Sequence, residues 1–293
     1  MRTVSLEELL EAGCHFGHQV SRQNAKAREY IFEPRDGIHI IDLEKTKEGL
    51  EEAAKFVKEI AKKNGTLLVL GTKRQAIGVL DEERKNLEKE GVDGVYFVTK
   101  RWIGGTLTNY SEVAKNYKKL KDIAIKVKDP ASRSKFTKKE LSDMDKMRQK
   151  LEGFYGGIAD MPAVPDAIFI VDTHEEHVAA NEAVIAGIPT VGITDTNADP
   201  TIITYPIPAN DDAVGSIKLI TDYIFAAWIE GKKNKQEAAA PKASTPSSGQ
   251  EKEEKKETVE KKKETPKEDK KEVKSEKAAE KKKEAPKKPS TKK

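Results

Sequence analysis

Short, uninterrupted apolar runs recur along the first 231 residues and alternate with amphipathic segments. A strand whose side chains are apolar without alternation is buried on both faces, which is typical of a parallel sheet covered by helices. The pattern therefore predicts an α/β fold with a doubly wound parallel sheet of about five strands. The predicted strands are residues 37–41, 66–70, 94–98, 167–171 and 188–193.

Helix signals fill the gaps between these runs. Ser5 followed by Glu8 has the pattern of a capping box that begins a short helix, which Gly13 would end. Asp42 can cap a second helix, whose apolar positions recur at helical spacing until the chain nears Asn64. Further helices are predicted at about 74–90, at about 175–186 and from Asp211 or Asp212 through Trp228, whereas 13–28 is predicted to be a loop with local turns.

The connection between the third and fourth predicted strands, residues 99–166, breaks this rhythm. Residues 109–128 and 138–151 both have a helical pattern, each with one narrow apolar stripe. Because a short turn joins them, we expect an antiparallel helical (coiled-coil) hairpin inserted at about 106–153. Long insertions in compact domains usually serve function, so the hairpin is a candidate binding element.

Apolar residues become scarce from Lys232 onwards. Residues 232–293 contain 22 Lys, 13 acidic residues and five Pro, but no aromatic residue. Such a segment cannot bury enough apolar surface to offset the conformational entropy lost on folding. We expect residues 1–231 to form the folded domain and residues 232–293 a disordered Lys/Glu-rich tail, whose contacts with phosphate would be weak and non-specific.

Charge is unevenly distributed over the predicted domain. Residues 100–150 contain 15 Lys or Arg against 6 acidic residues, whereas the rest of the domain contains 17 against 31. A polyanion would therefore meet a localised basic element, the hairpin. Residues 151–231 contain 13 acidic residues and a single basic one, Lys218, so this part should face solvent, a metal ion or a basic protein.

Cys14 is the only cysteine, which excludes an intrachain disulfide and fits a reducing compartment. The N-terminus lacks the apolar core of a signal peptide. No apolar run has the roughly 18–20 residues that are needed to span a bilayer. These features predict a cytoplasmic chain with no membrane partner.

The turn after the first predicted strand contains no glycine-rich phosphate loop, which argues against nucleotide binding. Gly104 and Gly105 more simply allow a sharp turn into the hairpin. The neighbouring Arg101 and Trp102 offer a phosphate donor and a stacking face, as RNA contacts often do. Alternatively, Trp102 packs at the base of the hairpin and Arg101 caps a carbonyl, and the sequence does not decide between the two.

Cys14, His15 and His18 lie close enough in the sequence for a zinc site, but no neighbouring Cys or His offers a fourth ligand. Next to Arg22 and Arg28, the two histidines suit a phosphate-facing loop better. Acidic residues near the predicted strand ends could form an acid–base pair or bind Mg²⁺, although helix capping explains most of them. We therefore predict no catalytic residue, metal site or cofactor. These acidic residues are Asp172, Glu175, Glu176, Asp195, Asp199, Asp211 and Asp212.

Several sequence blocks occur in an order that is specific to one family. They are AGCHFGHQ at 12–19, GIHIIDLEKT at 37–46, GTKRQA at 71–76, RWIGGTLTN at 101–109, PDAIFIVD at 165–172, DTNADP at 195–200 and NDDA at 210–213. Together they resemble the bacterial-type second protein of the small ribosomal subunit over roughly residues 6–228. The resemblance implies a flavodoxin-like domain with a protruding coiled-coil hairpin. It also implies a structural role in the small subunit, in its assembly and in translation, with small-subunit rRNA and neighbouring ribosomal proteins as partners and no small-molecule substrate.

Charge and resemblance together give a candidate rRNA-binding surface on the hairpin, the N-terminal loop and the adjoining body loops. The alternative, from a different class of protein, is an α/β enzyme that binds a phospho-ligand beneath a helical lid, whereas our prediction is that the chain is not an enzyme. The predicted rRNA-binding residues are His15, His18, Arg22, Lys26, Arg28, Lys73, Arg74, Lys100, Arg101, Trp102, Lys115, Lys118, Lys119, Lys121, Lys126, Lys128, Arg133, Lys135, Lys138, Lys139 and Arg148.

Overall fold

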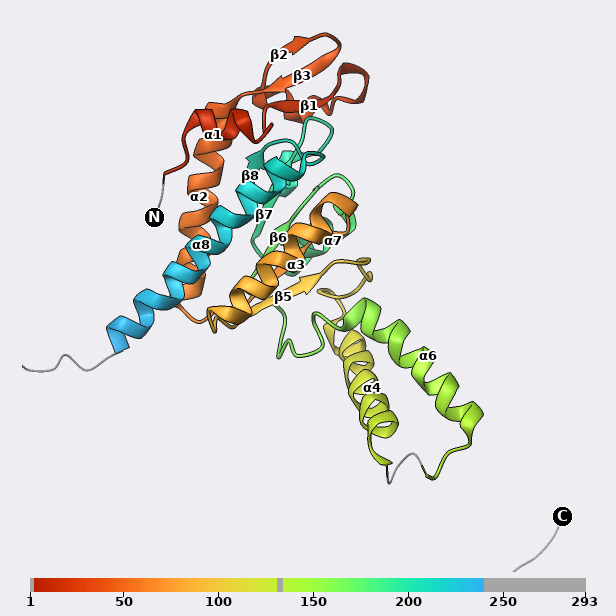
Figure 1. The fold of residues 1–293 in the computed structure, drawn as a ribbon. Helices are drawn as coiled ribbons and strands as arrows, with labels where there is room; N and C mark the ends of the chain where they lie inside the picture. The colour runs from red at the N-terminus through yellow and green to blue at the C-terminus, as the bar shows by residue number, and fades with distance from the viewer. Residues whose placement is uncertain (1–2, 131–133, 240–293) are drawn as a thin grey trace, which may run out of the picture. The chain divides into compact units, whose positions relative to one another are not determined.

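A computed structural model describes residues 3–130 and 134–239 of the chain (Figure 1). The predicted contact Arg133 and residues 240–293 of the predicted tail lie outside these ranges. In the described part, no helix is both long and apolar enough to cross a membrane.

The central element is a parallel sheet of five strands in the order β5-β4-β6-β7-β8. Numbered along the chain, this is the order 2-1-3-4-5 of a flavodoxin-like fold, so the predicted fold class is confirmed. The strands are β4 (Leu67–Leu70), β5 (Val95–Val98), β6 (Ala167–Ile170), β7 (Thr190–Thr194) and β8 (Tyr205–Pro208).

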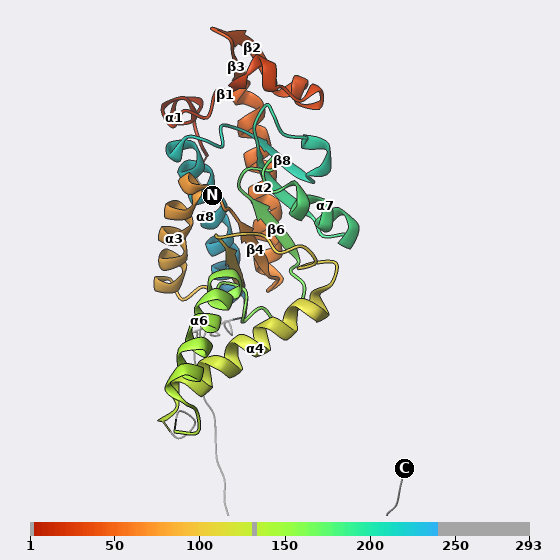
Figure 2. The same ribbon diagram turned by 90° about the vertical axis from the view of Figure 1, so that its right-hand side faces the viewer.

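Helices cover both faces of this sheet. Successive side chains of a strand point to opposite faces, and both sets are apolar here, so each face must be covered. In β4, Leu67 and Val69 belong to the apolar cluster with α2 (Leu43–Lys62), α3 (Arg74–Lys89) and α8 (Val214–Ala239). Leu68 and Leu70 belong to a second cluster, which contains residues of α7 (His177–Ala186) and of the hairpin base. Figure 2 shows α3 and α8 on one side of the strands and α7 on the other.

A second, three-stranded antiparallel sheet in the order β1-β3-β2 lies near the N-terminus. The predicted strand at 37–41 forms, but as β3 of this sheet rather than as a parallel strand. The fifth parallel strand is β8, which was not predicted. Part of the predicted loop at 13–28 forms a strand and 3₁₀ helices. The elements of this region are β1 (Phe16–Gln19), β2 (Ile31–Arg35) and β3 (Ile38–Ile41), with the 3₁₀ helices η1 (Val20–Arg22) and η2 (Ala25–Tyr30).

Two of the predicted helix starts are confirmed by their caps. Ser5 and Glu8 form the capping box of α1 (Leu6–Glu11), in which each side chain bonds the other residue's backbone N–H. Asp42 caps α2 by accepting from the backbone N–H of Glu44. At the other end of the domain, α8 continues to Ala239 and so passes the boundary that we expected at residue 231.

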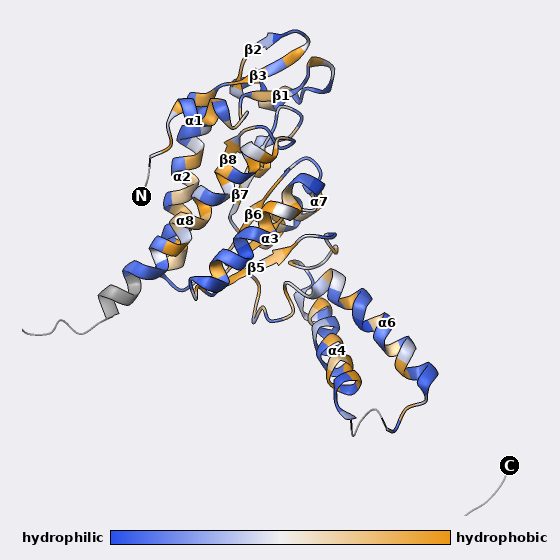
Figure 3. Cartoon of the chain, viewed as in Figure 1, coloured by the Kyte–Doolittle hydropathy of each residue, from blue (hydrophilic) through white to orange (hydrophobic). Residues whose placement is uncertain are grey.

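The predicted hairpin consists of α4 (Tyr110–Lys128) and α6 (Lys138–Tyr155), which pack against each other. Tyr117 of α4 makes an edge-on ring contact with Tyr155 of α6, with ring centroids 5.5 Å apart. Figure 3 shows hydrophilic residues along both helices. The buried residues of α4 are Val113, Tyr117, Leu120 and Ile123, so one face of this helix packs inward and the other is left to solvent.

Candidate functional site

Exposed lysines cover the outer face of α4 and the tip of the hairpin. In the described part of the chain, seven of the predicted contacts are exposed and take part in no ion pair, so their ammonium groups are available to a phosphate. The alternation of buried and exposed positions along α4 places the four lysines of this helix opposite its packed face, and the other three lie at the tip and in the first turn of α6. These residues are Lys118, Lys119, Lys126, Lys128, Lys135, Lys138 and Lys139.

Three other predicted contacts of the hairpin are held by acidic neighbours. Lys115 Nζ lies 2.6 Å from Glu112 Oε1, and Lys121 Nζ lies 2.8 Å from Asp160 Oδ1. Arg148 is half-buried on α6 between Asp145 and Glu152 and forms ion pairs with both. Pairing on an exposed surface is weak, so the two lysines can exchange these partners for a phosphate, whereas Arg148 is more firmly held.

The N-terminal segment contributes a smaller group of cations. Arg22 and Arg28, on the two 3₁₀ helices, are exposed. Lys26 is also exposed, but its Nζ lies 2.6 Å from Asp199 Oδ2. The ring of His15 contacts that of Phe16 in a tilted arrangement, with ring centroids 3.9 Å apart, and burial lowers the pKa of the His15 imidazole.

The two predicted contacts at the turn between β4 and α3 lie in different environments. Arg74 is exposed, whereas the side chain of Lys73 is only 15% exposed and lies among three carboxylates. Its Nζ is 2.7 Å from Asp211 Oδ1, 2.7 Å from Asp212 Oδ1 and 3.1 Å from Asp172 Oδ2. Burial would lower the pKa of Lys73, but the hydrogen bonds to Asp211 and Asp212 outweigh it and raise the pKa.

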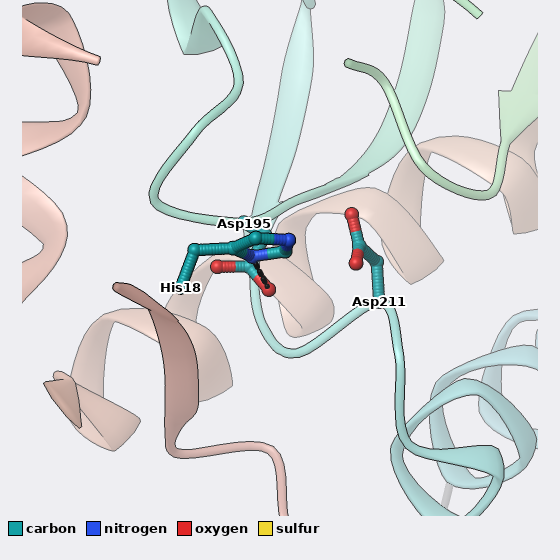
Figure 4. Close-up of side chains that lie close together, drawn as sticks. All are labelled: His18, Asp195 and Asp211. Carbon is teal, nitrogen blue, oxygen red and sulfur yellow. Dashed lines mark ion pairs between the residues drawn. The ribbon is translucent and has the colours of Figure 1, made fainter. Parts of the chain in front are cut away.

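Of the carboxylates around Lys73, Asp211 also belongs to a cluster with His18 and Asp195 near the carboxyl ends of the parallel strands (Figure 4). His18 Nδ1 lies 3.0 Å from Asp195 Oδ2, and one ligand atom from each residue lies within 4.8 Å of the others. Burial raises the pKa of Asp211 to about 7. The pKa of His18 is also raised, chiefly by its hydrogen bond to Asp195.

The fold brings these residues together from distant parts of the sequence. The backbone N–H of His18 donates to Thr196 Oγ1 at 2.9 Å, which ties β1 to the loop after β7. Gly17 allows this close approach, because a Cβ there would lie 2.7 Å from Thr196 Cγ2. The cluster therefore joins the small sheet to the end of the large one, a juxtaposition that no local sequence pattern reveals.

Capping accounts for only some of the acidic residues at the strand ends. Asp172 accepts from the backbone N–H groups of His174 and Glu175, and Asp199 accepts from that of Thr201. Asp211 is different, because its Oδ1 accepts from Lys73 and its buried Oδ2 has no hydrogen-bond partner among residues 3–130 and 134–239. One imidazole and two carboxylates can ligate a small cation.

The predicted absence of a metal remains a prediction. Cys14, considered in sequence for a zinc site, is not in this cluster: it is buried, and burial raises the pKa of its thiol.

The loop between β5 and α4 contains the last predicted contacts. Lys100 and Arg101 are exposed, whereas Trp102 is buried and its Nε1–H donates to Glu182 Oε1 at 3.2 Å. This environment fits the packing alternative for Trp102. Sequence reasoning missed Glu182, although a carboxylate on the apolar face of α7, next to Ala179 and Ala183, was a signal that it must have partners.

Together, the flavodoxin-like sheet and the lysine-covered hairpin define an α/β domain with an inserted cationic helical arm. A family model described as Ribosomal protein S2 matches residues 9–231. The chain belongs to this family. It is therefore a structural, RNA-binding protein of the small ribosomal subunit, associated with ribosomes and in general terms with the cytoplasm, and its family is structural rather than enzymatic.

Proposed function

We propose that the chain binds small-subunit rRNA mainly through the hairpin, with α4 and the tip contacting phosphates. The observation that carries this proposal is the set of exposed lysines without ion pairs on α4 and at the hairpin tip. A-form RNA presents phosphates and 2′-hydroxyls to a protein, while its deep major groove is closed to side chains. A stiff helix carrying lysines along one side suits such a target, which is recognised by shape rather than by sequence.

The body adds a second set of contacts in this proposal. Arg22, Arg28, Arg74, Lys100 and Arg101 are exposed, and none of them is in an ion pair within the described ranges. Lys73 and Trp102 are now left out of the proposed interface. Lys73 is already neutralised by carboxylates, and Trp102 is buried. His18 is left out as well, because its Nδ1 is paired with Asp195.

Neighbouring small-subunit proteins are the proposed partners of the acidic part, residues 151–231. This part has a single basic residue, and phosphate would be repelled from it. By binding rRNA through the basic hairpin and proteins through the acidic part, the chain would contribute to the assembly of the subunit.

The proposal is tested by reversing charge on α4. The variant Lys118→Glu, Lys119→Glu, Lys121→Glu and Lys126→Glu changes exposed positions only, so the fold should be retained. The matched control carries the same change at four exposed lysines of the body helices, Lys55, Lys62, Lys85 and Lys89. We expect the hairpin variant to be lost from small subunits assembled in the presence of wild-type competitor, and the control to be incorporated. Equal incorporation of both variants would show that these hairpin lysines are not needed for binding to the subunit.

A further inference from the structure

The loop that leads from β5 into α4 is organised around one carboxylate of α7. Glu182 Oε1 accepts from Trp102 Nε1 at 3.2 Å and from the backbone N–H of Gly105 at 2.8 Å. Its Oε2 accepts from the backbone N–H of Leu107 at 3.2 Å and from Thr108 Oγ1 at 3.4 Å. Four donors from this short loop therefore converge on a single buried side chain, which is 8% exposed.

These bonds determine the conformation of the loop. The N–H groups of Gly105 and Leu107 lie outside any strand or helix, so no regular backbone ladder supplies their acceptor, and Glu182 does. Gly105 has a φ of +89°, which favours glycine. Hydrogen bonds to a carboxylate are about twice as strong as neutral ones, and a buried carboxylate without donors is costly. Glu182 and the loop thus stabilise one mutual arrangement.

The other side of the hairpin base is held differently. Gly157 O accepts from the backbone N–H of Phe97 at 3.1 Å, which ties the segment after α6 to β5. Tyr110 Oη donates to Met161 O at 2.7 Å, which ties the first turn of α4 to the same segment. These contacts join the hairpin to its own outgoing segment and to an edge strand. The bonds to Glu182 join it to α7, a helix that packs on the face of the sheet.

We infer that Glu182 is a positioning residue for rRNA binding: it fixes the direction in which the hairpin leaves the body, so that the hairpin lysines and the body arginines meet one RNA surface together. This inference rests on the proposed function for its consequence in binding. The geometric part stands independently, because it concerns the hairpin axis in the free protein.

The test compares full-length Glu182→Ala and Glu182→Gln with Asn181→Ala, an exposed neighbour on the same helix, as the matched control. Spin labels at Glu59→Cys on α2 and Lys139→Cys on α6, both exposed, report the distance between body and hairpin. Labels at Glu59→Cys and Glu88→Cys report the body alone. Binding to isolated small-subunit rRNA is then measured over a range of salt concentrations.

We expect Glu182→Ala to broaden the body–hairpin distance distribution and to leave the body distance narrow. Binding should weaken roughly tenfold with a shallower dependence on salt, because fewer phosphates are contacted at once. Glu182→Gln, which keeps one carbonyl oxygen for two of the donors, should be intermediate. A body–hairpin distribution as narrow as that of wild type in Glu182→Ala would overturn the inference.

Two further measurements keep the outcomes separate. If Glu182→Ala fails to fold, two milder variants must still broaden the distribution: Glu182→Gln, which loses the two bonds to one oxygen, and Thr108→Val, which loses one bond. A wild-type width in both would also overturn the inference. If the charge-reversed hairpin variant binds rRNA normally, the proposed function fails, whereas the distance measurement still decides whether Glu182 fixes the hairpin.

Discussion

Lys73 Nζ lies 2.7 Å from Asp211 Oδ1, and this pair occupies the switch point of the sheet between β4 and β6. Flavodoxin-like folds hold their ligands at this point, often with an anionic group at the following helix N-terminus. Here the cation of the turn is already surrounded by Asp172, Asp211 and Asp212. The place where the alternative enzyme would bind a phospho-ligand is therefore filled by carboxylates of the chain itself.

Replacing Lys73 with Met should destabilise the fold by about 3 kcal/mol at pH 8, because Asp211 would be left as a buried charge without its counter-ion. The folded-state pKa of Asp211, already raised to about 7, should rise further in this variant. A carboxyl group with a raised folded pKa takes up a proton more readily in the folded state, so lowering the pH to 5 should restore much of the loss. Urea unfolding at both pH values measures this.

The control for this prediction is Arg74→Met, which removes an exposed cation from the adjacent position. Its unfolding free energy should stay within about 0.5 kcal/mol of wild type. A Lys73→Met protein as stable as Arg74→Met at pH 8 would show that the pair contributes little.

His18 should make stability depend on pH above the ordinary histidine pKa of 6.5. Its folded pKa is raised above the ordinary value of 6.5, chiefly by the hydrogen bond to Asp195. A raised folded pKa means that the contribution is complete below pH 6.5 and is lost as the pH rises through the folded value. Urea unfolding of wild type should therefore show a decline in this window that His18→Gln lacks. Parallel pH profiles of the two proteins would contradict this assignment.

Trp102→Phe separates the two sequence-based interpretations of this residue. Because the indole N–H donates to buried Glu182, its loss should reduce stability by about 1 kcal/mol. Affinity for rRNA should change by less than about twofold, since three donors to Glu182 remain. Unchanged stability together with a large loss of affinity would instead favour stacking on RNA.

Glycines at the hairpin base and in α3 should respond to alanine in opposite directions. At Gly157 a Cβ would lie 2.0 Å from Phe97 O, so Gly157→Ala must displace the segment from β5 and cost on the order of 1–3 kcal/mol. At Gly78, inside α3, a Cβ would meet nothing within 4 Å, so Gly78→Ala should stabilise by about 0.5–1 kcal/mol. Thermal unfolding of both variants is the measurement, and destabilisation by Gly78→Ala would contradict the packing described.

The sequence predicts the fold class well because the buried strands are apolar without interruption and the helices carry recognisable caps. It misses β8, because Pro206 and Pro208 lack N–H groups and read as breakers, yet an edge strand tolerates them. It also misses the β2–β3 hairpin, although Asp36 and Gly37, both with positive φ, form a typical two-residue hairpin turn.

The sequence likewise predicts one part of the candidate site and misses another. Helical spacing predicts which lysines of α4 are exposed, because that depends on one element alone. Whether Lys73 faces phosphate or carboxylate depends on Asp211, 138 residues further along the chain. Whether Trp102 in the β5–α4 loop faces RNA or the interior depends on Glu182 of α7, 80 residues further along. Charge counted along the chain cannot distinguish a free cation from one neutralised within the fold.

The central claim is that the hairpin lysines lie against rRNA, and lysine–RNA crosslinking in intact small subunits tests it most directly. We expect mapped crosslinks at Lys118, Lys119 and Lys126 of α4 and at Lys138 or Lys139 of α6, with none at Lys218 of the acidic part. Crosslinks confined to residues 151–231, with the hairpin lysines free to react with a soluble amine reagent, would contradict the account.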